Sequence, residues 1–429
     1  MFVIAIVILN FLSSGACLNI NINARIKHND YLKNHQIPAK QKELWITMDS
    51  DAAKLVSKSS ISSRISSSDD GTPALLRIDE QNLPLISRMF HGRRQFGEYI
   101  VHQSLEEANR YRSRAKFGDQ SVFIPPKINN KRVVLALQKF IQSKRILQFV
   151  HILTRSFKNR DYKSSYGIKA SQFIKDVWTQ IALPRKDIKV SFYEHSGFPQ
   201  KSVIVTITGS EKVNKGNDTK SGIVIIGAHL DSINQDVIDQ SIARAPGADD
   251  NGSGLSMLTE VLRVIVETDY RPKKIIQIMA FAGEEKGKLG SGEISSVYRK
   301  HGTEVEAMLN FDMIGYKGRG KDIYISSDRT NKDLATFLSH LISIYLPNVT
   351  HEPMIYCGGC SDHAQWFRDD FPAVMASAAI APNDVDTFNP KYHTAEDLKV
   401  DEKHMKNFAL LTVAFIAELA KGDIVLDDN

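Results

Sequence analysis

From Pro125 and Pro126 to the C-terminus, apolar runs of strand length alternate with amphipathic stretches of helix length. Four segments have the short apolar pattern of buried strands: 202–208, 222–227, 274–281 and 307–311. Four others repeat apolar residues on one helical face: 170–181, 255–265, 334–345 and 408–419. Alternation of this kind is typical of a largely parallel sheet with helices on both faces. We therefore expect an α/β fold with a mostly parallel mixed sheet, preceded by a smaller, different N-terminal part.

Composition narrows the class of protein further. The chain has 429 residues, 42% of them hydrophobic and 24% charged, which allows a large core and argues against disorder. The net charge is +6, but the basic residues are spread along the chain, which disfavours a nucleic-acid partner. Three cysteines, Cys17, Cys357 and Cys360, are too few to build a disulfide scaffold, so the fold must rest on its core.

The first residues indicate secretion. Residues 1–12 are an apolar run too short to span a membrane comfortably, and Ser14 and Ala16 stand where signal peptidase prefers small residues. We expect a signal peptide over residues 1–16 and a secreted protein. A membrane anchor and a lipoprotein site before Cys17 are the alternatives, because no Lys or Arg precedes the apolar run. No later segment reaches about 18 uncharged apolar residues, so no stable membrane span is expected.

Histidine and acidic side chains stand at the ends of the expected strands. They are His229, Asp231, Asp249, Asp250, Glu284, Glu285 and Asp312, joined by His393 from a loop near the C-terminus. Open α/β sheets bind ligands beyond the carboxyl ends of their strands, so these side chains can converge on one crevice. Gathered there, they would repel one another strongly without a cation. Two divalent metals about 3.5–4 Å apart meet that need, and mixed imidazole and carboxylate ligands favour zinc.

Five motifs resemble a known family, in the family's order. They are residues 229–232 (HLDS), 246–254 (PGADDNGSG), 282–285 (AGEE), 310–313 (NFDM) and 392–394 (YHT). They look like the motifs of zinc aminopeptidases related to secreted bacterial leucyl aminopeptidase, and the likeness runs from about Pro125 to the C-terminus. The resemblance implies a two-zinc exopeptidase acting on peptides with a free amino terminus.

The resemblance also implies a role for each site residue. Asp250 would bridge two Zn²⁺ ions per chain. One zinc would be held by His229 and Asp312, and the other by Glu285 and His393. Asp231 would orient the His229 imidazole, and Glu284 would be the general base that activates water.

The substrate pocket is implied in the same way. Met313, Met375, Phe388 and Tyr392 match apolar lining positions, and uncharged hydrophobic first residues are expected to be preferred. The Cys357-Gly-Gly-Cys360 loop is one residue shorter than in the bacterial relatives and lacks their tyrosine, for which Tyr356 is a candidate substitute. A disulfide between the two cysteines is expected; a redox pair and a zinc knuckle are the alternatives.

The N-terminal part resembles the pro-segment of the same enzymes in residues 43–46, 78–84 and 99–102. We expect a pro-segment over 17–123 that covers the site and a catalytic domain over 124–429, with a monomeric mature enzyme. The serine-rich tract 57–68 is low in complexity and is expected to be flexible, between structured pieces at 42–47 and 74–79. Asn217 and Asn348 are expected glycosylation sites, whereas Asn251 lies inside a metal motif.

Three other functions remain open from the sequence. A glutaminyl cyclase-like acyltransferase with one zinc is disfavoured because every position of the two-metal set is filled. A non-catalytic peptidase-like binding domain is disfavoured because Glu284 is also present. A carboxypeptidase would need a cation for the substrate's terminal carboxylate, and no arginine candidate stands near the motifs.

Overall fold

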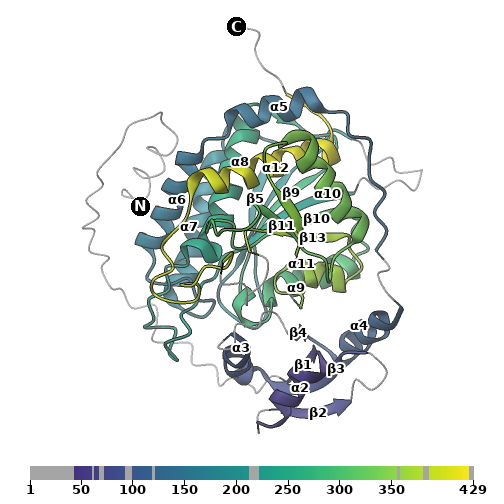
Figure 1. Ribbon diagram of the computed structural model, residues 1–429, viewed down its shortest axis with the longest axis vertical. Coiled ribbons are helices and arrows are strands. Elements are labelled where there is room, and N and C mark those ends of the chain that lie inside the picture. Colours follow the sequence, from purple (N-terminus) through teal and green to yellow (C-terminus); the bar gives the residue numbers. More distant parts are fainter. Residues whose placement is uncertain are drawn as a thin grey trace.

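The computed structural model describes residues 43–59, 62–66, 72–91, 99–117, 121–211, 222–354, 358–379 and 386–424. The expected signal peptide, Cys17, Asn217, Tyr356 and Cys357 lie outside these ranges. The described residues form a large α/β body and a smaller N-terminal unit packed against one end of it (Figure 1). Within the described ranges, no helix is long and apolar enough to cross a membrane.

An eight-stranded mixed sheet forms the centre of the body, in the order β12-β11-β13-β10-β7-β9-β6-β5. The strands are β5 (Ile188–Tyr193), β6 (Ser202–Ile207), β7 (Ile223–His229), β9 (Ile276–Phe281), β10 (Val305–Phe311), β11 (Ile323–Ile325), β12 (His351–Pro353) and β13 (Ala373–Ser377). The central strands β13, β10, β7 and β9 are parallel, and antiparallel pairing adds β6 and β5 at one side and β11 at the other. The expected mostly parallel mixed sheet is therefore confirmed.

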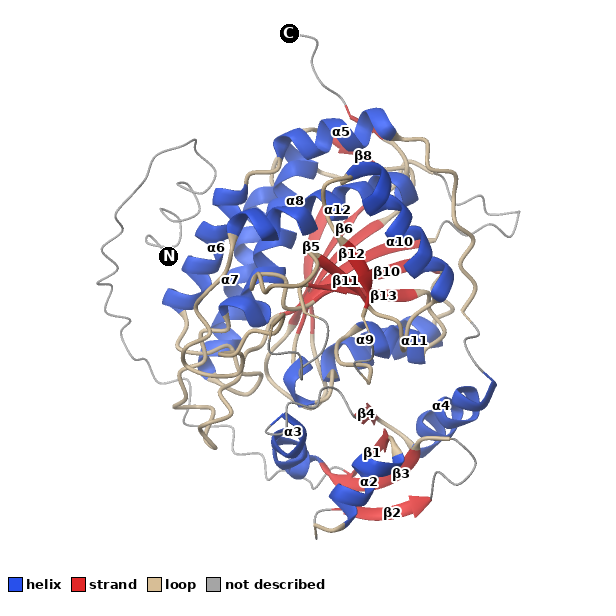
Figure 2. Ribbon diagram, viewed as in Figure 1, coloured by secondary structure: helices blue, strands red, loops and turns tan. Residues whose placement is uncertain are grey.

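Helices cover both faces of this sheet (Figure 2). The body's helices are α5 (Lys131–Phe140), α6 (Ser143–Ser156), α7 (Ser165–Ala182), α8 (Gly254–Glu267), α9 (Leu289–Lys300), α10 (Lys332–Tyr345), α11 (His363–Arg368) and α12 (Glu402–Ala420). Along β7 the side chains alternate: Ile226 packs in the core built with α8 and α12, and Ile225 packs with Trp366 of α11 on the other face. Both faces are buried, which is why this strand is apolar throughout. A short ribbon of β8 (Tyr270–Arg271) and β14 (Asp423–Ile424) lies apart from the main sheet.

The N-terminal unit is an antiparallel sheet, β2-β3-β1-β4, with helices and its own apolar core. Its elements are β1 (Glu43–Met48), α2 (Ser50–Ser57), β2 (Ser62–Ser66), β3 (Ala74–Asp79), η1 (Glu80–Asn82), α3 (Leu83–His91), β4 (Tyr99–His102) and α4 (Leu105–Phe117). The expectation of a flexible serine tract is wrong at Ser62–Ser66, which pairs with β3. Pairing of backbone groups needs no apolar side chain, so the serine composition concealed this strand.

The residues just before the expected boundary at 123/124 contact the body. Phe123 is buried in the core of the body, with its ring centroid 5.6 Å from that of Phe337. The Asn331 side chain donates to the carbonyl oxygen of Ser121 at 2.9 Å. Ser121 and Phe123, among the last described residues of the expected pro-segment, therefore pack against the body.

Candidate metal centre

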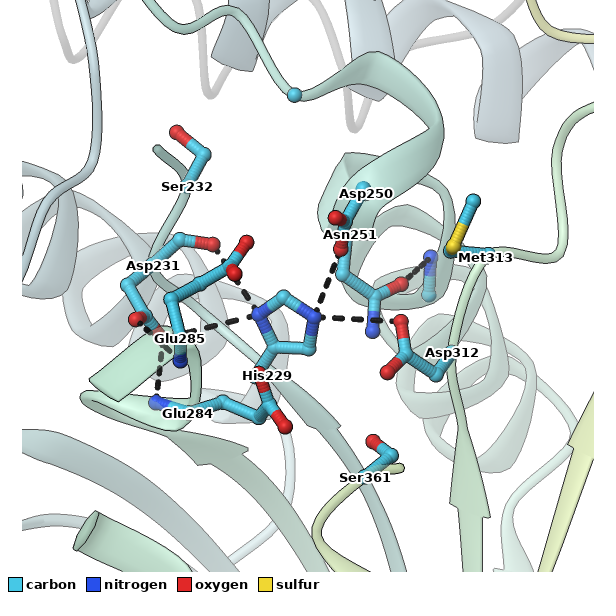
Figure 3. Close-up of polar contacts among 12 residues, drawn as sticks. His229, Asp231, Ser232, Asp250, Asn251, Glu284, Glu285, Asp312, Met313 and Ser361 are labelled. Carbon is cyan, nitrogen blue, oxygen red and sulfur yellow. Dashed lines mark hydrogen bonds and ion pairs between the residues drawn. The ribbon is translucent and has the colours of Figure 1, made fainter. Parts of the chain in front are cut away.

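The histidine and acidic side chains meet at one end of the parallel strands. His229 is the last residue of β7, Asp312 follows β10, and Glu284 and Glu285 begin a turn (η3, Glu284–Lys286) directly after β9. Asp250 lies in an irregular helical turn before α8 (η2, Ala248–Ser253). Because β7, β9 and β10 are parallel, their carboxyl ends share one edge, and the side chains face each other there (Figure 3).

Two groups of donor atoms share Asp250. One is His229, Asp250 and Asp312, the other is Asp250, Glu285 and His393, and within each group the donor atoms lie within 4.8 Å of one another. Oδ1 of Asp250 is 3.0 Å from Nε2 of His229, and Oδ2 is 2.7 Å from Nε2 of His393. The two oxygens of one carboxylate thus face one histidine each, which is the geometry of a bridging ligand.

Hydrogen bonding determines which nitrogen of His229 is free to bind a cation. Its Nδ1 lies 3.1 Å from the carbonyl oxygen of Asp231, and a carbonyl can only accept a hydrogen bond. Nδ1 therefore carries a proton, and Nε2, which faces Asp250 and Asp312, is the nitrogen that would bind a cation. On the second histidine, the Gln235 side-chain amide contacts Nδ1 of His393, and Nε2 faces Asp250 and Glu285.

The Asp231 carboxylate has three neighbours. It lies 3.6 Å from Nδ1 of His229, and its oxygens accept the backbone N–H groups of Glu284 and Glu285 at 2.9 and 3.0 Å. It therefore fixes the turn that carries both glutamates. Gly283, before that turn, has a φ of 68°, a conformation that glycine adopts without steric cost.

Several residues that hold the Asp250 turn gave no signal in the sequence. Asp397 accepts the backbone N–H groups of Asp249 and Asp250, both at 3.1 Å. The buried Arg160 donates to the carbonyl oxygens of Leu230, Pro246 and Gly247, at 2.6–2.9 Å. These contacts join segments far apart in the chain, so no local spacing could have revealed them. Gln235 lies only six residues after His229, but the residue it contacts is His393, which is distant in the chain. The sequence therefore did not reveal this contact either.

Burial makes this edge of the sheet electrostatically unfavourable without a cation. Desolvation raises the pKa of Glu284 well above its usual value and raises that of Glu285 to about 7. Desolvation also opposes the charge of Asp250, but the positive charges of His393 and His229 outweigh it and lower the Asp250 pKa. Oε1 of Glu285 is buried with no hydrogen-bond partner among the described residues. This buried set of imidazole and carboxylate donors fits a zinc ion.

The pocket beside these donors is covered by the N-terminal unit. Phe90 of α3 and Tyr99 of β4 line it together with Glu284, Met313 and other residues of the body. The Ser87 hydroxyl of α3 donates to the carbonyl oxygen of Glu285 at 2.9 Å. The N-terminal unit therefore contacts the very turn that carries the two glutamates.

The expected apolar lining residues divide between two clusters. Met313, Phe388 and Tyr392 are buried together, and the rings of Phe388 and Tyr392 lie 4.7 Å apart. Met375 is buried in a neighbouring cluster against Cys360. Cys360 is disulfide-bonded; its expected partner lies outside the described residues, so the pairing stays a prediction.

Comparison with known proteins identifies the family. Residues 202–416, half of the chain, match the sequence profile of peptidase family M28. The chain belongs to this family. Leucine aminopeptidase 1 of Arthroderma otae is 37% identical over 285 residues, covering 62% of this chain and 71% of the relative. The M28 assignment confirms the expected zinc aminopeptidase family.

Solved structures support the same assignment over nearly the whole chain. The LapA aminopeptidase of Legionella pneumophila is 25% identical, with a TM-score of 0.72, covering 90% of this chain and all of that one. LapB of the same organism is 28% identical, also with a TM-score of 0.72, covering 88% and 100%. This M28 chain is a zinc-dependent aminopeptidase, a hydrolase that acts on peptides.

Proposed function

We propose that this M28 enzyme hydrolyses the first peptide bond of peptides with a free amino terminus, using two zinc ions per chain. The observation that carries the proposal is Asp250, whose two carboxylate oxygens face His229 and His393 separately. His229 and Asp312 would hold one zinc, and Glu285 and His393 the other, with Asp250 between them. The donor atoms of each set lie within 4.8 Å of one another, which supports this division.

Glu284 is the general base in this proposal. Bound zinc would lower the pKa of a water molecule and stabilise negative charge on the scissile carbonyl oxygen. Glu284 lines the same pocket as the donors but belongs to neither donor group, so its carboxylate is free to accept the proton of the attacking water. The raised pKa of Glu284 suits the second step, in which it gives that proton to the leaving amine. Asp231 holds the Glu284 backbone in place.

The apolar cluster of Met313, Phe388 and Tyr392 supports a preference for uncharged, hydrophobic first residues. Tyr392 stacks on His393, with ring centroids 4.0 Å apart, so this apolar wall is continuous with the second donor group. The first side chain of a substrate would rest there while the scissile carbonyl faces the metals.

The N-terminal unit is proposed to be an inhibitory pro-segment, made after a signal peptide over residues 1–16 and removed after secretion. Phe90 and Tyr99 occupy the pocket that a substrate must enter. Arg368 of the body binds the unit through the Val101 carbonyl oxygen at 3.1 Å and the Glu107 carboxylate at 2.7 Å. Because Ser121 and Phe123 pack against the body, we place the cut before residue 121.

A panel of aminoacyl amides, assayed with and without a chelator, tests this function. Cleavage of leucyl and methionyl substrates should exceed that of glutamyl and lysyl ones, and chelation should abolish it. N-acetylated peptides should resist cleavage, and metal analysis should give about two zinc ions per chain. One zinc with pyroglutamate formation would indicate the cyclase alternative, and zinc binding without turnover would indicate a binding domain.

A further inference from the structure

Lys288 places a cation in a pocket that is otherwise acidic and apolar. Its side chain lines the pocket with Glu284, Met313 and Cys360, and the residue is only 3% exposed. Its φ is 59°, which is uncommon for a residue other than glycine. The backbone N–H of Lys288 donates to the Glu284 carbonyl oxygen at 2.7 Å. One tight turn therefore carries both the general base and this lysine.

The Lys288 ammonium lacks a fixed anionic partner. Across the described residues it has no hydrogen bond and no ion pair, and it lies 5.8 Å from the ring centroid of Tyr99 in the N-terminal unit. Burial lowers the pKa of Lys288, and the negative charge of Glu284, followed by those of Asp362, Asp312 and Glu285, opposes this effect. None of these carboxylates forms an ion pair with the ammonium, so a carboxylate of the substrate could make that direct contact.

The position of Lys288 decides which part of a substrate it would meet. The apolar wall of Phe388 and Tyr392 adjoins His393, on the side that receives the first side chain. Glu284 gives its proton to the leaving amine, so the leaving residue must lie beside Glu284. Lys288 belongs to the Glu284 turn, and Glu284 is the carboxylate that acts most strongly on its ammonium. On this placement its ammonium would lie on the side of the leaving residue.

We propose that Lys288 is a specificity-determining residue that binds a carboxylate of the leaving residue, so that substrates carrying one there are favoured. The inference rests on the proposed function and refines its substrate class. In a dipeptide this group is the terminal carboxylate, whose carbon lies about 2.5 Å from the scissile nitrogen. In a longer peptide it is the side chain of an acidic second residue.

Two further observations agree with this assignment: the absence of a suitable arginine near the motifs, and the contact between Lys288 and Tyr99. No arginine near the motifs offers a cation for a substrate carboxylate, whereas a lysine stands four residues after Glu284. In the covered state the Tyr99 ring lies against the ammonium by a cation–π contact, which partly replaces the missing anion. Removal of the N-terminal unit would expose Lys288 to substrate.

Two matched substrate pairs test the proposal. Leucyl-alanine against leucyl-alanine amide reports on a terminal carboxylate, and leucyl-glutamate amide against leucyl-glutamine amide reports on an acidic side chain. The zinc-loaded full chain is assayed before and after limited proteolysis, as wild type and as Lys288→Met, Lys288→Arg and Lys286→Met. Lys286 is also buried on this turn but does not line the pocket, so it is the matched control.

In Lys288→Met, the acid-to-amide ratio of kcat/KM should fall about 10- to 100-fold for at least one pair, as for loss of a charged hydrogen bond. Lys288→Arg and Lys286→Met should keep the wild-type ratio within a few-fold. Unchanged ratios for both pairs would overturn the proposal while the aminopeptidase assignment stands. Equal loss on all four substrates would also overturn it, because Lys288 would then act on the base or the metals. If the wild type cleaves none of them, the proposed function fails as well.

Discussion

At the scale of single residues, adjacent Glu284 and Glu285 have different surroundings. Glu285 lies 2.8 Å from His393 within a donor group, whereas Glu284 belongs to neither group. Glu284→Gln should therefore keep its zinc and lose turnover by about 10²–10⁴-fold, as expected for a lost acid–base group. Glu285→Ala should lose zinc. Metal analysis of both variants beside kcat checks this, and equal zinc loss in both would refute the proposed division of roles.

We expect Arg160 to stabilise the fold as well as to position the segments that carry the site residues. It is 1% exposed, and its three acceptor carbonyls flank the segments that carry His229 and Asp250. Arg160→Met leaves these carbonyls without a partner and should lower the free energy of unfolding by about 3–5 kcal/mol, with weaker zinc binding. Arg132→Met removes an exposed arginine paired with Asp423 and should cost at most about 1 kcal/mol. Chemical denaturation compares the two; similar losses would contradict the role given to Arg160.

The sequence predicted the residues that meet at the strand ends but not those that hold them. His229, Glu284 and Asp312 directly follow or end apolar strands, so the strand-end rule alone brings them together. Asp397 and Arg160 act on backbone groups of loops distant in the chain, and only the folded turns create those contacts. Lys288 gave no signal in the sequence, because a lysine in the glycine-rich stretch after two glutamates has the composition of an ordinary solvated turn.

At the scale of elements, β4 of the N-terminal unit contains a histidine whose protonation the fold opposes. His102 is fully buried, with Nε2 2.8 Å from the Thr47 hydroxyl and Nδ1 without a hydrogen bond among the described residues. Burial lowers the pKa of His102 well below 6.5, and Arg368 adds to this effect. The carboxylate of Glu107, 4.0 Å away, is the nearest acidic group. Positive charge on Arg110 and Arg329 lowers the pKa further.

Because the folded pKa of His102 is depressed, its contribution to stability is complete above about pH 6.5 and is lost as the pH falls. The N-terminal unit should therefore lose about 1.4 kcal/mol of stability per pH unit below 6.5 from this residue. His102→Gln can keep the contact with Thr47 and should remove this part of the pH dependence. Denaturant titration at pH 7.5 and pH 5, followed by fluorescence of Trp45 opposite His102, measures it. The same pH dependence in both proteins would contradict the prediction.

The elements themselves were only partly predictable. β7, β9 and β10 are apolar because both faces of the sheet are covered. Their continuous apolar segments made them recognisable as strands in the sequence. The edge strand β5 has one buried residue in six, and β11 and β12 have three residues each, so they carry little pattern. The N-terminal sheet was foreseen only as two pieces, β1 and β3, because three of the five residues of β2 are serines.

At the scale of the whole molecule, the covered state depends on contacts between the two parts. Glu107 accepts from Arg368 at 2.7 Å and from the Ser296 hydroxyl at 3.3 Å. Glu107→Ala removes both contacts, together with the one that Glu107 accepts from the Gln103 backbone N–H inside the N-terminal unit, and should weaken docking of that unit by about 1.5–3 kcal/mol. The uncleaved variant should then hydrolyse a small aminoacyl amide at least several-fold faster than the uncleaved wild type.

The neighbouring Glu106 is exposed and provides the control. Glu106→Ala should leave the activity of the uncleaved chain unchanged, and both variants should reach the same activity after limited proteolysis. If the uncleaved wild type is already as active as the cleaved form, the N-terminal unit is an accessory domain and not an inhibitor.

The packing of Ser121 and Phe123 against the body also affects how well the enzyme resists self-digestion at high concentration. An aminopeptidase is surrounded by copies of itself, and each copy presents an amino terminus. In the proposed mature form that terminus would be anchored, because Phe123 is buried, Asn331 binds Ser121, and Pro125 and Pro126 follow. Trimming by neighbouring copies would stop where the chain enters the core. The fold would then determine the first residue of the long-lived form more than the specificity of the processing protease does. The same packing would protect that form from self-digestion.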